Sequence, residues 1–114
     1  MKAIYTYAAL AFCSISFGQQ LFIVNSDNKF GVVNENGVEI IPAKYSSVEE
    51  FDKIHPNWSK VGLGSLYGFI DKSGKIIIEP KYEEISVYNV YHEGWALVKK
   101  DGKFGFIDNA GKEI

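Results

Sequence analysis

A dipeptide of an aromatic residue and glycine recurs at a fixed interval along this chain. It stands at Phe30-Gly31, Tyr67-Gly68 and Phe104-Gly105, so each copy lies 37 residues after the one before. A fixed period of this length is typical of repeat proteins, whose units each have an apolar face that one unit cannot bury alone. We therefore expect stacked units rather than one closed enzyme core.

The same period aligns the rest of the chain without a gap. It gives a first unit of residues 21–57, a second of residues 58–94 and a partial third of residues 95–114. Two glycine columns and one tryptophan column are the repeated structural positions. They are Gly31, Gly68 and Gly105; Gly37, Gly74 and Gly111; and Trp58 with Trp95.

Short apolar runs separated by tight turns indicate strands within each unit. Residues 95–99 and 104–108 flank Asp101-Gly102, a pair typical of a two-residue hairpin. A second turn runs from Asp71 to Gly74, with an acceptor side chain first and a glycine that tolerates positive φ fourth. A third strand is predicted over residues 75–79, ending at Pro80 because proline has no backbone donor.

The segment after the third strand, residues 82–93, has a less regular pattern. Residues 85–88 alternate as a short strand does, whereas Tyr82 and Ile85 are spaced for one helical turn. We favour the strand because no helix cap is present. The predicted fold class is all-β, with tandem antiparallel β-hairpin or meander repeats of 37 residues in an open array or a propeller-like fragment.

The glycine within each second strand needs a separate explanation, since glycine there weakens a strand and offers no side chain. Its recurrence suggests that another group packs directly on the backbone. The prediction is a large ring, from Trp58, Trp95 or a tyrosine of a neighbouring unit. A simple bulge is the alternative.

Charge and composition exclude one class of partner. The net charge is −2, and all 12 basic residues counted as Lys or Arg are lysine. Guanidinium groups are the usual ligands for phosphate and guanine, so a chain without arginine is not expected to bind nucleic acid.

Residues 1–18 have the pattern of a signal peptide. Lys2 precedes an apolar stretch, and the small residues Ser16 and Gly18 stand three and one positions before Gln19. Cleavage after Gly18 predicts an exported domain of residues 19–114, periplasmic, at the cell surface or secreted, without a membrane span. The alternatives are a retained anchor or lipidation at Cys13, the only cysteine.

Several segments together resemble the WG repeat family, named for an aromatic-glycine pair. The matching segments are residues 67–71, 74–75, 80–82 and 93–98. The aromatic residue is never tryptophan here, and Asn34 replaces the usual aspartate of the first unit. The resemblance covers nearly all of residues 19–114 and implies tandem β-rich repeats of bacterial proteins that mediate interactions.

The candidate binding residues are aromatic and lie in the variable segment between units: Tyr88, Tyr91 and His92. Loops between repeats often carry binding, and exposed aromatic rings suit sugars or peptide side chains. Core packing is the alternative for Tyr88 and Tyr91, because they align with the apolar residues Phe51 and Ile54.

No pattern points to catalysis, a cofactor or a metal. His55 and His92 occupy the same repeat position, so stacking would hold them at least one unit apart. Residues 62–65 are glycine-rich but lack the helix and lysine of a phosphate loop.

The sequence therefore predicts a non-catalytic binding or scaffolding module whose partner is a protein or a cell-wall glycan. A purely structural fragment of a longer array is the alternative, and a hydrolase acting through His92 is a remote one. The final strand-forming residues, 111–114, leave an edge that could pair with the N-terminal strand, with another subunit or with further sequence.

Overall fold

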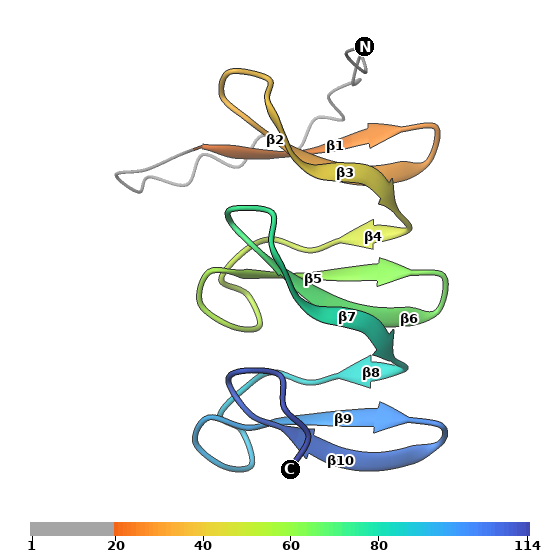
Figure 1. Cartoon of the computed structure of the whole chain (residues 1–114), viewed down its shortest axis with the longest axis vertical. Helices are drawn as coiled ribbons and strands as arrows, with labels where there is room; N and C mark the ends of the chain where they lie inside the picture. Colours follow the sequence, from red (N-terminus) through yellow and green to blue (C-terminus); the bar gives the residue numbers. More distant parts are fainter. Residues whose placement is uncertain (1–19) are drawn as a thin grey trace.

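The computed structural model describes residues 20–114, which form three antiparallel sheets stacked along the longest axis of the molecule (Figure 1). These residues contain strands and turns and no helix, so the predicted all-β class is confirmed. In this part of the chain no helix is long and apolar enough to cross a membrane. The predicted signal peptide, with Cys13, lies outside the described residues.

Each of the first two units supplies three strands to one sheet and a two-residue strand to the next, and the partial third unit supplies two strands. The sheets comprise β1 (Leu21–Ser26), β2 (Lys29–Asn34) and β3 (Glu39–Tyr45); β4 (Ser47–Val48), β5 (Trp58–Leu63), β6 (Leu66–Asp71) and β7 (Ile76–Tyr82); and β8 (Glu84–Ile85), β9 (Ala96–Lys100) and β10 (Lys103–Ile107). The short strands β4 and β8 therefore connect one sheet to the next.

Two cores lie between successive sheets, because alternate residues of a strand face opposite sides. Phe69 of β6 packs in one core with Val98 and Ile107 of the third sheet. The next residue, Ile70, packs in the other core with Val32 and Ile41 of the first sheet. The middle sheet is thus buried on both faces.

The two kinds of predicted turn are present. Asp101 and Gly102 both have positive φ, at 52° and 76°, as a two-residue hairpin of this type requires. In the second turn, Oδ1 of Asp71 accepts hydrogen bonds from the backbone N–H groups of Ser73 at 2.9 Å and Lys75 at 3.0 Å. The fourth residue of this turn is Gly37, Gly74 or Gly111 in the three units, with φ of 77°, 90° and 79°. A Cβ atom at Gly74 would also overlap the carbonyl oxygen of Ile40, so this glycine lets two sheets approach.

The prediction that a ring covers each mid-strand glycine is wrong. A Cβ atom at Gly31 would lie 2.5 Å from the carbonyl oxygen of Ile41 and 2.7 Å from the backbone nitrogen of Ala43. At Gly68 it would overlap the carbonyl oxygen of Ile78 and lie 2.7 Å from the nitrogen of Pro80. The backbone of the third strand, not an aromatic side chain, occupies the space that glycine leaves.

A bulge in the third strand brings that backbone close. Tyr67 pairs with Tyr82 and Phe69 pairs with Ile78, so three residues of β7 face the single residue Gly68. Pro80 lies inside this bulge, where no donor to the ladder is needed. The expected strand end at Pro80 is therefore wrong, and β7 continues to Tyr82.

The variable segment forms a strand only at its start. Glu84 and Ile85 form β8, and the residues up to Gly94 form turns and bends. Within them, Oδ1 of Asn89 accepts a hydrogen bond from the backbone N–H of Gly94 at 2.6 Å. The strand predicted over residues 85–88 is thus shorter and begins one residue earlier.

The array is open. The first and third sheets lie at opposite ends of the stack (Figure 1), so β1 does not pair with the C-terminal strand. Instead Glu113 forms an isolated antiparallel bridge with Ile107, and the N–H of Ile114 donates to the carbonyl oxygen of Phe106 at 3.0 Å.

Replacement of two equivalent glycines tests the close contact with the third strand. We expect Gly68→Ala to lower the free energy of unfolding by about 1–3 kcal/mol, because its methyl group overlaps fixed backbone. Gly105→Ala should change it by no more than about 0.5 kcal/mol, because no atom lies within 4 Å of the new Cβ. Urea unfolding measures both, and equal effects would contradict this account.

The turn carboxylates should contribute to acid sensitivity. Hydrogen bonds from the backbone N–H groups of Lys112 and Ala110 lower the pKa of Asp108 below its ordinary 3.8. For Asp71, burial raises the pKa, but the hydrogen bonds from Ser73 and Lys75 outweigh it and the net pKa is lowered.

A depressed pKa stabilises the fold above the unfolded-state pKa, and this contribution is lost as the pH falls through the folded-state pKa. Asn34 already makes equivalent turn bonds through Oδ1 in the first unit. We therefore expect the double variant Asp71→Asn, Asp108→Asn to lose less stability than the unchanged chain between about pH 5 and about pH 3. Urea unfolding at both pH values measures this, and parallel losses would count against it.

Candidate functional site

Each unit presents four large side chains on the face of its sheet that points toward the C-terminal end of the stack. The equivalent sets are Leu21, Ile23, Phe30 and Val32; Trp58, Lys60, Tyr67 and Phe69; and Trp95, Leu97, Phe104 and Phe106. We call the third set the outer face, because the described residues place no further sheet upon it (Figure 1).

The three sets differ in how far they are covered. Ile23 and Val32 are buried beneath the second sheet, and Phe69 is buried beneath the third. In the outer face, Phe106 is only partly buried and Phe104 is 63% exposed. Residues that form core in two units therefore form surface in the third.

In the second unit, the Tyr88 side chain covers the equivalent face. Its ring packs edge-on against Trp58 at 5.7 Å between centroids and lies 6.2 Å from Phe69. Its hydroxyl donates to the carbonyl oxygen of Asp108 at 2.9 Å. Burial, and then the nearby Asp108, raises the pKa of Tyr88, so the phenol stays protonated. Tyr88 belongs to the core and does not present its ring to a ligand.

The other two candidate residues flank the outer face. His92 stacks on Trp95 with centroids 3.9 Å apart, and its Nδ1 donates to the carbonyl oxygen of Glu93 at 2.8 Å. Tyr91 is 61% exposed and packs edge-on against Phe106 at 5.9 Å. Tyr91, His92, Trp95 and Phe106 thus form a continuous aromatic surface at the end of the stack.

The second unit has the same stacking of a histidine on a tryptophan, but there a residue of the third unit lies against the histidine. His55 stacks on Trp58 at 3.7 Å, and its Nε2 lies 3.1 Å from Oδ1 of Asn109 in the third unit. Asn109 thus approaches this ring from the following unit. His55 and His92 sit in successive units and make separate contacts, and among residues 20–114 no three His, Cys, Asp or Glu side chains gather as a metal site.

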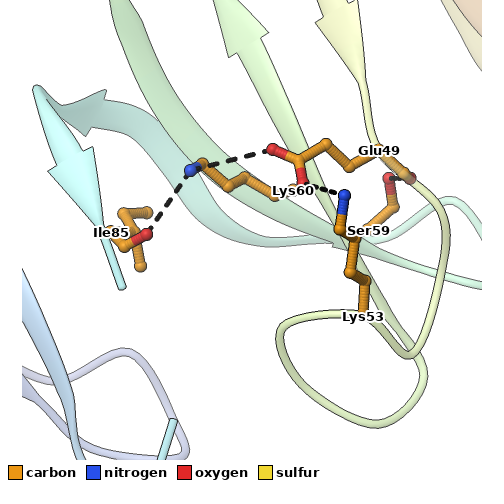
Figure 2. Close-up of polar contacts among 5 residues, drawn as sticks. All are labelled: Glu49, Lys53, Ser59, Lys60 and Ile85. Atoms are coloured by element: carbon orange, nitrogen blue, oxygen red, sulfur yellow. Dashed lines mark hydrogen bonds and ion pairs between the residues drawn. The ribbon is translucent and has the colours of Figure 1, made fainter. Parts of the chain in front are cut away.

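Polar contacts also attach the third sheet to the second. Figure 2 shows Lys60 between the carboxylate of Glu49, 3.7 Å away, and the carbonyl oxygen of Ile85 in β8, to which it donates at 3.4 Å. Lys53 reaches the same carboxylate at 3.6 Å. Lys60 thereby fixes the first strand of the following sheet.

The outer face has an apolar residue at the corresponding position. Leu97 replaces Lys60, and its backbone N–H donates a hydrogen bond to Oγ of Ser86 at 3.0 Å. Lys99 borders the face, with its amino group 5.5 Å from the Phe104 ring centroid. The surface is therefore apolar at its centre and charged at its margin, as interaction surfaces of proteins are.

The sequence identified part of this surface. Its pattern predicts Tyr91 and His92 as binding residues and Trp95 as a repeated structural position, but it predicts no binding role for Leu97, Phe104 and Phe106. The three residues stand at alternate positions of two paired strands, and this spacing indicates that they lie on one side of the sheet. The sequence did not show which side the stack leaves uncovered.

A family model for WG-containing repeats matches residues 30–53 and 67–104. The chain belongs to the WG-containing repeat family. No curated protein and no solved structure matches it. Membership accounts for the repeated sheets, since both matched segments begin at the aromatic residue before the mid-strand glycine. The function of this WG repeat protein has to be inferred from its own surface.

The two tryptophans of the WG repeats should differ in their contribution to stability. Trp58 is 8% exposed, so Trp58→Ala should lower the free energy of unfolding by about 3–5 kcal/mol. Trp95 lies in the outer face and is partly exposed, so Trp95→Ala should cost only about 1–2 kcal/mol. Urea unfolding compares the pair, and a larger loss at Trp95 would contradict the assignment of the outer face.

Proposed function

We propose that this WG repeat protein is an exported, non-catalytic binding module that holds a partner protein against its outer face. The observation that carries the proposal is the difference in cover between equivalent positions. Two sets of four side chains lie beneath a following sheet, and in the part of the chain that the structure describes the third set, Trp95, Leu97, Phe104 and Phe106, does not.

The chemistry of the outer face supports a protein partner. In the first two units, the equivalent faces are covered by apolar side chains of another sheet, such as Val61 over the first and Val98 over the second. Exposed apolar area is present in and beside this face, since Tyr91 and Phe104 are 61% and 63% exposed. Clustered exposed apolar surface of this kind favours protein association.

Export and the absence of catalysis are parts of the same proposal. The pattern of residues 1–18 supports export with cleavage after Gly18. Among the described residues, His92 donates to a backbone carbonyl and stacks on Trp95, so structural contacts account for it without a catalytic role.

A cell-wall glycan is the second candidate partner, because Tyr91 and Trp95 present aromatic rings at the surface. Sugars bind by stacking on an open ring face. One face of Trp95 is already occupied by His92 at 3.9 Å, which makes the glycan the less favoured partner.

Substitution of Leu97 by lysine tests the binding role with little risk to the fold. The second unit has Lys60 at this position, and the sheet accommodates it there. Leu97→Lys places a charge at the centre of the outer face, so it should weaken capture of envelope proteins by the immobilised chain at least about tenfold. The matched control is Leu63→Lys, at a hairpin residue that is 45% exposed and lies in the second sheet.

Quantitative mass spectrometry measures the amount of each captured protein. A parallel assay, co-sedimentation with purified peptidoglycan, measures binding to the glycan. Equal capture by both lysine variants, or none by the unchanged chain, would oppose the binding role and favour a structural one. The mass of the protein recovered from the producing cells reports cleavage, with Gln19 as the expected first residue.

A further inference from the structure

The two junctions between successive sheets differ in charge at equivalent repeat positions. We call the contact of the first sheet with the second the first junction, and that of the second sheet with the third the second junction. The second junction contains Lys60 and Glu113, and the residues at the equivalent positions one unit earlier are Ile23 and Ile76. The repeat therefore has charged side chains at the second junction where it has apolar ones at the first.

Lys60 lies between the second and third sheets with only 16% of its side chain exposed. Its amino group is 3.7 Å from Oε2 of Glu49 and 3.4 Å from the carbonyl oxygen of Ile85 in β8 (Figure 2). It also lies 4.6 Å from the ring centroid of Tyr67, and Lys53 lies 3.6 Å from the other carboxylate oxygen of Glu49. Removing the counter-charge of a lysine in such a position is costly, because the ammonium group stays partly desolvated.

A second carboxylate reaches the same junction from the third unit. Oε2 of Glu113 accepts a hydrogen bond from the Tyr82 hydroxyl of the second sheet at 2.7 Å and lies 3.6 Å from the Lys100 amino group. The bond from Tyr82, followed by the charges of Lys100 and Lys81, lowers the pKa of Glu113 below its ordinary 4.5. A depressed pKa gives stability above the unfolded-state pKa, and this stability is lost as the pH falls through the folded-state pKa.

Other titratable groups near this junction respond differently to acid. Both ring nitrogens of His55 face oxygen atoms, a backbone carbonyl at 2.8 Å and Oδ1 of Asn109 at 3.1 Å, so a protonated ring keeps both contacts. Glu84 lies 3.7 Å from Lys99, and both belong to the third sheet. Acid therefore acts on the second junction through the two carboxylates described above.

We propose that the second junction is an acid-sensitive closure, in which protonation of Glu49 and Glu113 loosens the third sheet from the second while the first junction stays closed. Protonated Glu49 leaves the Lys60 ammonium group between the sheets without its counter-charge. Protonated Glu113 loses its attraction to the neighbouring lysines. Opening exposes the apolar face that carries Trp58 and Phe69. This inference does not require a partner on the outer face.

Hydrogen exchange of each backbone amide, followed by NMR, measures the opening of each sheet separately. Protection factors, which are corrected for the intrinsic pH dependence of exchange, are compared at about pH 5.5 and about pH 3.5. We expect them to fall at least about tenfold more in β9 of the third sheet than in β2 of the first. Equal falls in the two strands would overturn the inference.

The double variant Lys60→Ile, Glu113→Ile gives the second junction the residues of the first. Replacement of a buried ion pair by apolar residues often preserves stability, so the fold should persist. The acid responses of β9 and β2 should then agree within about threefold. Asp108 is unchanged in this variant, so a tenfold difference that remains would assign the acid response to the turn of the third sheet and overturn the inference.

Glu49→Gln removes the counter-charge of Lys60 at neutral pH and keeps the shape of the side chain. It should lower protection in β9 at least about fivefold at about pH 7 and leave β2 unchanged. The matched control is Glu50→Gln, which removes the charge of the exposed neighbouring residue and should leave both strands unchanged. The same protection in both glutamine variants, or a parallel loss in β9 and β2, would refute the acid-sensitive closure.

Discussion

Burial of the C-terminal face of the first and second sheets beneath the sheet that follows each is the constraint on which this structure depends. Every sheet is small, with three or four strands, and carries large apolar side chains on that face. Phe69, for example, is buried in one core with Val98 and Ile107 of the next sheet. A three-stranded sheet with one exposed apolar face is unstable by itself, so the units are stable only as a stack.

Close approach of backbone atoms makes that stacking possible. Gly68 allows the bulge around Pro80 to lie directly on β6, which lets β7 reach Tyr82 and place its ring between the second and third sheets. Gly74 and Gly111 allow the turns to contact the preceding sheet. The glycines therefore allow close backbone contacts both within a unit and between units. Polar contacts such as that of Lys60 with Ile85 also join successive sheets.

The third unit is informative because it repeats the chemistry of the second in a different environment. Trp95 and His92 reproduce the stacked pair of Trp58 and His55, yet no ring equivalent to Tyr88 covers them among the described residues. The outer face follows from the absence of a covering sheet within residues 20–114.

The period, the turns at Asp71 and Asp101 and the position of most strands can be predicted from the sequence, because these depend on residues close together in the chain. The sequence also marks Tyr91, His92 and Trp95 as aromatic residues near a junction. The folded structure was needed to show that backbone, not a ring, covers Gly68, that β7 passes through Pro80 and that Tyr88 is core. Those features depend on contacts between residues of different strands and units. Alternation along one strand defines two faces, but it does not show which of them another sheet will cover.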